Sequence, residues 1–188
     1  QNSRIRVIEL VNQNITAETI LSLETRKGYV EADLQQDLLK VAMFDRYDQI
    51  GKVAIGFLKG FGARIGAVGT TINLDENTLL IAGSSDSDMA LCANALIESG
   101  GGMAVINHGQ IVEKIDFPVG GIFNLSPWRK IGQDLRRIHR CLRGQGSQFE
   151  RPMYALCFLS FVTLPSLRIT ARGLVNAKER RIVPLFVE

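Results

Sequence analysis

The chain has 188 residues, of which 46% are hydrophobic and 22% are charged, and its formal net charge is +3. This composition excludes a disordered or fibrous protein and can fill one sizeable hydrophobic core, so we expect a single domain over residues 1–188. The apolar runs are shorter than the ~20 residues that cross a bilayer, so we expect a soluble protein without membrane partners. The three cysteines lack CxxC spacing, which favours buried free thiols in a reducing, cytoplasmic compartment over a disulfide or a metal role.

The first half of the chain is predicted to form a β-sheet. Two apolar runs flank a polar turn at residues 12–14, and a second turn follows at Lys27 and Gly28. Four later runs are rich in Val and Ile and are bounded by Gly, Asp and Asn, as is typical of buried strands: residues 40–47, 52–61, 66–72 and 78–83. We expect a turn at residues 48–51 between the first two of these runs. Short strands joined in this way indicate a mixed or antiparallel sheet.

A helix is predicted over residues 86–99, because apolar side chains recur there at helical spacing: Met89, Cys92, Ala93, Leu96 and Ile97. Ser85 and Asp88 have the spacing of a capping box at its start. Consecutive glycines end the helix, and a β-hairpin is expected next, with its turn at His108 and Gly109.

A second helix is predicted to begin after Pro127, with one apolar stripe: Trp128, Ile131, Leu135, Ile138 and Leu142. A third, buried helix is expected over residues 152–162, ending before Leu164 and Pro165. The chain closes with a strand at residues 167–170, a turn at 172–175 and a strand at 181–187. These elements predict an α/β (α+β) fold in which about three helices flank a mixed, largely antiparallel sheet.

The sequence offers few residues for metal or nucleophilic chemistry. His108 lies in the expected hairpin turn, and His139 lies on the polar side of the second helix. Neither has a Cys, Asp or Glu at metal-ligand spacing, so we expect two solvated imidazoles and no metal or cofactor site built by this chain alone. No GxSxG nucleophile motif occurs, and Ser84 and Ser85 are interpreted as helix-capping residues.

The glycine-rich segment over residues 56–66 has some features of a phosphate-binding loop, because its backbone amides and the nearby Lys59 could surround an anion. Its glycine spacing fits neither the dinucleotide fingerprint nor a Walker loop. Two interpretations therefore stay open. The segment is a close-packed turn with positive φ at one of its glycines, or Lys59 faces a functional cleft and is a candidate catalytic residue.

Charge divides unevenly along the chain. Residues 1–127 carry ten Lys/Arg against fifteen Asp/Glu, whereas residues 128–188 carry twelve against four. The second helix supplies half of the later cations: Arg129, Lys130, Arg136, Arg137, Arg140 and Arg143. Such a face could contact nucleic acid, but no aromatic side chains interleave with the arginines. A solvated face, or a docking face for an acidic neighbouring domain, is therefore favoured over a nucleic-acid partner.

Two long blocks carry a resemblance to a known family. They are DLLKVAMFDRYDQIGKVAIGFLKGFG from Asp37 and GSSDSDMALCANALIESGGGMAVI from Gly83. In the same order follow VINHGQIVEKIDFPVGGIFN, RPMYALCFLSFVTLPSLRIT, RGLV and LFVE. Together they resemble the C-terminal domain of bacterial and archaeal adenine deaminases, in the amidohydrolase superfamily, from about Ile5 to Glu188.

The resemblance implies one part of a two-part hydrolase. Family members look like an N-terminal amidohydrolase barrel, whose His, Asp and Glu residues hold manganese or iron, packed against this domain. Their purine-salvage reaction hydrolyses adenine to hypoxanthine and ammonia. We therefore expect the barrel as partner, homo-oligomers, and no activity of the isolated chain, which begins at Gln1 like an excised fragment. The alternative is a non-catalytic module, derived from the domain, for ligand binding or subunit association.

One segment departs from the family pattern. Where the family commonly shows SSVAHDSHN, residues 70–78 retain the aspartate as Asp75 but place Leu74 and Asn77 at the two histidine positions. A histidine oriented by an aspartate can hydrogen-bond a purine nitrogen or carry a proton. Asp75 is thus a candidate catalytic residue whose histidine neighbours are lost. The alternative is that the family's histidines only brace a turn.

Overall fold

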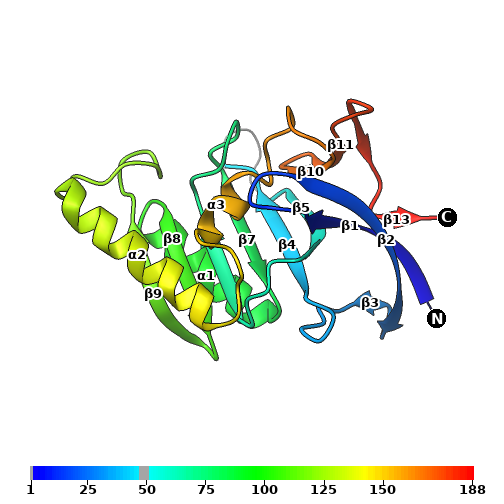
Figure 1. Ribbon diagram of the computed structural model, residues 1–188, viewed down its shortest axis with the longest axis horizontal. Helices are drawn as coiled ribbons and strands as arrows, with labels where there is room; N and C mark the ends of the chain where they lie inside the picture. The colour runs from blue at the N-terminus through cyan, green and yellow to red at the C-terminus, as the bar shows by residue number, and fades with distance from the viewer. Residues whose placement is uncertain (1, 47–50) are drawn as a thin grey trace.

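The computed structural model describes residues 2–46 and 51–188, so the turn predicted over residues 48–51 lies outside the described residues except for Gly51. The described residues fold into three helices and two sheets (Figure 1). The helices are α1 (Asp86–Glu98), α2 (Trp128–Gly144) and α3 (Pro152–Cys157). The larger sheet contains β1 (Asn2–Leu10), β2 (Thr16–Arg26), β3 (Tyr29–Val30), β4 (Leu38–Phe44), β5 (Val53–Lys59), β6 (Ala67–Thr70), β7 (Leu79–Gly83), β8 (Gly102–Asn107), β9 (Gln110–Asp116) and β13 (Phe186–Val187). The smaller sheet contains β10 (Leu167–Thr170), β11 (Gly173–Asn176) and β12 (Arg181–Val183).

The larger sheet is mixed and largely antiparallel, which confirms the predicted fold class. Its strand order is β3-β2-β1-β5-β4-β7-β6-β8-β9, and β13 pairs with β1 outside this path. β1 and β5 run parallel, with Ile8 opposite Leu58 and Glu9 opposite Lys59. No helix in the described part of the chain combines the length and the apolar character needed to span a membrane.

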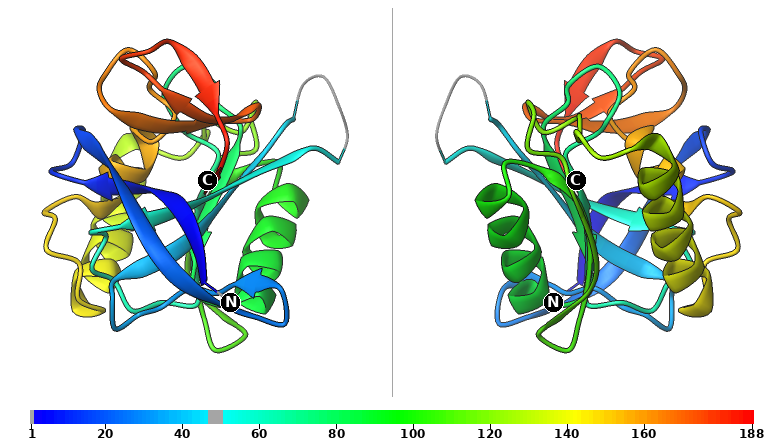
Figure 2. Two further views of the ribbon diagram at one scale, coloured as in Figure 1. Left: turned by 90° about the vertical axis from the view of Figure 1, so that its right-hand side faces the viewer. Right: turned by 90° about the vertical axis from the view of Figure 1, so that its left-hand side faces the viewer.

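The central strands are buried on both faces, which explains why they read as continuous apolar runs. In β7, Leu80 and Ala82 belong to a core shared with α2 and α3, whereas Leu79 and Ile81 belong to the core under α1. This alternation follows from the two-residue period of a strand. Figure 2 shows the consequence, with α1 and α2 on opposite sides of the sheet.

α1 begins where the sequence predicts. The Ser85 hydroxyl oxygen accepts a hydrogen bond from the Asp88 N–H at 3.3 Å, which satisfies one of the free donors of the first turn. The reciprocal half of the capping box does not form, because the Ser85 N–H donates to the Gly66 carbonyl at 3.1 Å and the Asp88 carboxylate accepts from the Gly109 N–H at 2.8 Å. The capping role predicted for Ser84 is wrong, since its hydroxyl donates to the Ile65 carbonyl.

α1 lies very close to β6. A Cβ built on Gly69 would stand 2.7 Å from the Cys92 sulfur, so only glycine permits this approach. Cys92 and Leu96 are completely buried, but Ile97 is 64% exposed. The predicted apolar stripe is therefore one residue too wide, because the sheet covers only the side of the helix that carries Cys92 and Leu96.

α2 also begins after Pro127 as predicted, but its apolar stripe is buried only in part. Ile138 and Leu142 are completely buried, whereas Trp128 is 76% exposed and has the Arg129 guanidinium 5.1 Å from its ring centroid. Trp128 is the first residue of α2.

α3 is shorter than predicted and ends at Cys157 instead of residue 162. The cause is a tertiary contact. The Cys157 carbonyl accepts a hydrogen bond from the Leu74 N–H at 2.9 Å, and the Phe158 carbonyl accepts one from the buried guanidinium of Arg168 at 2.7 Å. These two carbonyls have partners outside the helix, so the helical hydrogen bonds do not continue past this point.

The C-terminal region differs from the prediction in two respects. The expected turn at residues 172–175 is instead strand β11, paired with both β10 and β12. The expected single strand over residues 181–187 is divided into β12 and β13, with Pro184 between them, a residue that lacks the N–H needed to continue a ladder.

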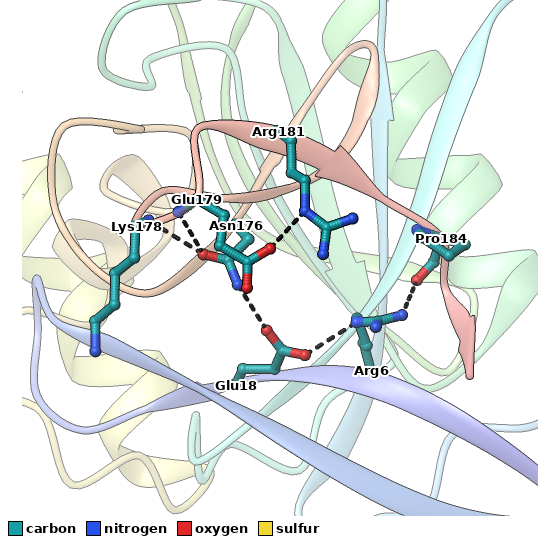
Figure 3. Close-up of polar contacts among 7 residues, drawn as sticks. All are labelled: Arg6, Glu18, Asn176, Lys178, Glu179, Arg181 and Pro184. Atoms are coloured by element: carbon teal, nitrogen blue, oxygen red, sulfur yellow. Dashed lines mark hydrogen bonds and ion pairs between the residues drawn. The ribbon is translucent and has the colours of Figure 1, made fainter. Parts of the chain in front are cut away.

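A polar network joins this C-terminal region to the first hairpin (Figure 3). The Arg6 guanidinium pairs with Glu18 at 2.9 Å and donates to the Pro184 carbonyl at 2.9 Å. The other oxygen of Glu18 accepts from the Asn176 side chain at 3.3 Å. Residues 158 positions apart in sequence are thus fixed against each other, and the two sheets pack as one unit.

Candidate functional site

Leu74, Asp75 and Asn77, the positions compared with the family pattern, lie in the loop between β6 and β7, residues 71–78. Asn73 is completely buried and makes two hydrogen bonds within this loop. Its side-chain amide donates to the Thr78 main-chain carbonyl at 2.5 Å, and its main-chain carbonyl accepts from the Asn77 N–H at 3.0 Å. Asp75 and Asn77 adopt left-handed conformations with φ of 73° and 45°, which these residue types tolerate best after glycine. Leu74 and Asp75 are exposed to solvent.

The same loop is tied to the end of α3. The Leu74 N–H donates to the Cys157 carbonyl at 2.9 Å, and the Leu74 carbonyl accepts from the Ser160 hydroxyl at 2.6 Å. The Cys157 thiol lies 3.0 Å from the Ile72 carbonyl, and burial raises its pKa to about 12, so it stays protonated at neutral pH. The loop and the end of α3 are therefore joined by hydrogen bonds.

Lys59 lies far from Asp75, so the two candidate residues do not form one site. Lys59 ends β5 opposite Leu38, at the start of β4. The loop that contains Asp75 precedes β7, whose first residue pairs with Phe44 at the opposite end of β4. At about 3.3 Å per residue, this separates the two by roughly 20 Å.

The glycine segment beside Lys59 is a close-packed turn. Gly60 and Gly62 have φ of 88° and 78°, and a Cβ on Gly60 would stand 3.0 Å from the Leu10 carbonyl oxygen. The Gly62 N–H donates to the Asp37 carboxylate at 2.8 Å. The turn interpretation is confirmed, with two positive-φ glycines instead of one, while the functional role of Lys59 stays a prediction.

A cleft that the sequence did not predict lies between α2, α3 and the sheet, and we call it the arginine cleft. Its volume is about 650 Å³. Its apolar side chains are Ile72, Met103, Leu135, Met153 and Cys157, with Tyr154 beside them. Its charged and titratable side chains are Arg136, His139, Arg140, Arg143, Glu150 and Arg151. Ile72 belongs to the β6–β7 loop and Cys157 is hydrogen-bonded to it, so the cleft and the loop adjoin.

The electrostatics of α2 differ between its two sides. Toward β9, the buried Asp134 pairs with Lys130 at 2.8 Å and with Arg137 at 2.7 Å, and Arg137 also reaches Glu113 at 3.2 Å. The hydrogen bond from Lys130 and the one from Arg137 hold the pKa of Asp134 below its ordinary value, although burial opposes them. On the cleft side, the four arginine guanidinium groups have neither an ion pair nor a hydrogen bond within the described residues.

His139 is not the solvated side chain that the sequence predicts. It lines the cleft, its Nδ1 is enclosed, and that atom has no hydrogen-bond partner among the described residues. Burial lowers the pKa of His139, and the positive charges of Arg151 and Arg143 lower it further. His139 is therefore neutral at physiological pH. The prediction for His108 is confirmed, since it is exposed in the hairpin turn.

The cysteines and the possible metal ligands were examined over all described residues. The three cysteines are free, as predicted, and only Cys92 is fully buried. Within residues 2–46 and 51–188, no group of three or more His, Cys, Asp or Glu side chains lies close enough to hold a metal ion.

Comparison with known proteins establishes the family. Residues 13–181 match the family described as the adenine deaminase C-terminal domain. The chain belongs to this family. An adenine deaminase of Clostridium botulinum (strain Langeland) is 34% identical over 184 residues, 97% of this chain and 31% of that protein. The adenine deaminase of Moorella thermoacetica gives the same values, and that of Cenarchaeum symbiosum is 34% identical over 186 residues, 99% of this chain and 30% of that protein.

These adenine deaminase C-terminal domains match almost the whole chain, but the chain spans less than a third of the length of these curated relatives. The sequence did not predict the arginine cleft. The positions of Arg136, Arg140 and Arg143 at helical spacing were a visible signal of one charged face. The contribution of Glu150 and Arg151 was not visible, because they follow α2 and return to it only in the tertiary structure.

Proposed function

We propose that this chain is the C-terminal domain of a two-part enzyme that hydrolyses adenine to hypoxanthine and ammonia. The observation that carries the proposal is the family match over residues 13–181, together with relatives named adenine deaminase at 34% identity. Because the chain spans about 31% of those relatives, the remaining length leaves room for an amidohydrolase barrel as its partner.

The chain's own residues do not fit the manganese or iron that the resemblance implies. His108 stands in the β8–β9 turn and His139 in α2, and no cluster of ligating side chains joins either of them within the described residues. A metal with nitrogen and oxygen ligands needs several such groups around one point. We therefore assign no metal-binding role to this chain, and we propose that the metal-dependent step belongs to the barrel.

We also propose that the enzyme is cytoplasmic and homo-oligomeric. Three free cysteines favour a reducing compartment. A run of exposed apolar side chains extends from the segment after β9 to the first residue of α2 and favours burial by the barrel or by a second copy: Val119, Phe123, Leu125 and Trp128.

The test is to express the product of the complete gene and the 188-residue chain side by side, and to assay both for hypoxanthine with added manganese or iron. We expect activity in the complete product if it carries a barrel with an intact His-x-His motif, and none in the chain alone. Hypoxanthine formation by the chain above a metal-free control would contradict the proposal.

The second candidate function is a non-catalytic module for ligand binding or subunit association. It is favoured by the replacement of the family's two histidines with Leu74 and Asn77. A complete gene product that contains no barrel, or one with a barrel that leaves adenine unchanged, would support this second function.

A further inference from the structure

The arginine cleft holds positive charge that the protein does not neutralise. Its lining contains four arginines against one carboxylate, Glu150, which leaves three net positive charges when His139 is neutral. The arginines come from two separate segments: Arg136, Arg140 and Arg143 from α2, and Arg151 from the residue before α3. The four arginines are exposed to solvent, so water screens much of their mutual repulsion, and a bound anion removes the part that remains.

The wall of the cleft is also kept open at one position. Gly132 lies within α2, where glycine costs about 1 kcal/mol relative to alanine. Packing does not require this glycine, because a Cβ built on it would meet only the Arg136 guanidinium, at 3.6 Å. Its backbone lies outside the positive-φ region. Glycine at position 132 therefore destabilises the helix slightly and leaves space in the cleft, although no contact within the domain requires it.

The floor and the walls differ in character. Met103 and Met153 are almost completely buried and form an apolar floor, whereas the Tyr154 ring is about half exposed at the side. A concave site with an apolar base and a few converging charges is the usual form of a small-molecule site, and about 650 Å³ lies within the usual size range.

We propose that the arginine cleft binds a phosphate monoester attached to an apolar, planar body. A phosphate monoester carries nearly two negative charges at neutral pH and three acceptor oxygens, which suits paired guanidinium forks better than a single carboxylate does. The planar body would lie over the methionine floor and against Tyr154. An extended nucleic acid is a poorer fit, because its backbone would need a groove with several stacking rings, and the cleft offers one.

This binding is independent of deamination, so its test requires no enzyme activity. Isothermal titration calorimetry on the full chain uses adenosine monophosphate and phenyl phosphate as probes, with adenosine and inorganic phosphate as partial ligands. We expect both monoesters to bind, and each partial ligand to bind at least about tenfold more weakly, because each makes only part of the contacts.

Two variants test the location of the site. The double substitution Arg136→Gln/Arg143→Gln removes two charges from the cleft, and Gly132→Leu fills the cleft without changing its charge. We expect each to weaken monoester binding at least about tenfold. The matched control is Arg129→Gln, which removes a charge from the same helix outside the cleft and should change the affinity less than about twofold. Thermal melts confirm that each variant is folded.

Several outcomes would overturn the proposal. One is that neither monoester binds the folded chain. Another is that Arg129→Gln weakens binding as much as the cleft variants, which would show a diffuse surface attraction. Binding of a short single-stranded RNA without binding of the monoesters would show a nucleic-acid surface. Binding by the chain but not by the complete gene product would show that another domain covers the cleft.

Discussion

Arg168 provides the sharpest test of how this domain is held together. Its side chain is completely buried and has no carboxylate partner among the described residues. Instead it donates hydrogen bonds to four main-chain carbonyls: those of Phe158 at 2.7 Å, Pro165 at 2.7 Å, Asn14 at 2.8 Å and Leu164 at 3.0 Å. Burial lowers the pKa of Arg168 to about 10, so the guanidinium is still charged at neutral pH.

We expect Arg168→Met to destabilise the fold by about 3 kcal/mol, as the balance of two opposing effects. A hydrogen bond to a charged group contributes about 1.5–3 kcal/mol, and four such part-buried bonds are lost. The substitution also removes a buried charge, whose desolvation cost is several kcal/mol, and this offsets most of the loss. For a chain of this size, about 3 kcal/mol corresponds to a Tm lower by about 6–12 °C.

Urea unfolding followed by circular dichroism measures this loss. Arg168→Lys should recover only part of it, because one ammonium with three donors cannot reach four carbonyls spread around a planar fork. Arg172→Met is the matched control, since Arg172 is exposed nearby, and it should change the stability by less than about 0.5 kcal/mol. If Arg168→Met is as stable as the wild type, the carbonyl contacts do not outweigh the cost of burying the charge.

Three further predictions concern the loop, the cleft and the first helix. In the complete gene product, Leu74→His with Asn77→His should raise kcat/KM for adenine by ~10²-fold, the usual size of an acid–base contribution, and Asp75→Ala in that background should remove most of the gain. His139 has a lowered pKa in the folded state, so its stabilising effect is fully present above pH 6.5 and is lost as the pH falls toward that folded pKa; His139→Gln should flatten the pH dependence of unfolding in this range. Ser85→Ala removes the α1 cap and should cost about 1 kcal/mol in urea unfolding.

Each of these predictions has a contrary result. An unchanged rate with both histidines restored and the fold intact would show that the β6–β7 loop is structural. Identical pH profiles for the wild type and His139→Gln would show that the enclosed imidazole titrates as it does in the unfolded chain. A Ser85→Ala variant as stable as the wild type would show that water replaces the cap.

Features that depend on neighbouring residues along the chain follow from the amino-acid sequence alone. The β8–β9 hairpin turns at His108 and Gly109, both with positive φ, as the short polar link between two apolar runs predicts. The start of α1 at Ser85 follows from its short side-chain acceptor. Such features are local because turn and cap geometry involves only a few consecutive residues.

Which distant segments meet follows from the folded chain as a whole. Residues 158–162 continue the predicted third helix, yet they leave it where Leu74 and Arg168, both distant in the sequence, donate to the Cys157 and Phe158 carbonyls. In the same way, the arginines of α2 become a cleft only where Arg151 returns beside them over the buried Met153. Helical periodicity shows which face of a segment is apolar, but it does not show which other segment covers that face. The covering segment depends on the whole chain, because the fold with the lowest free energy has the least exposed apolar area and the fewest unpaired buried polar groups.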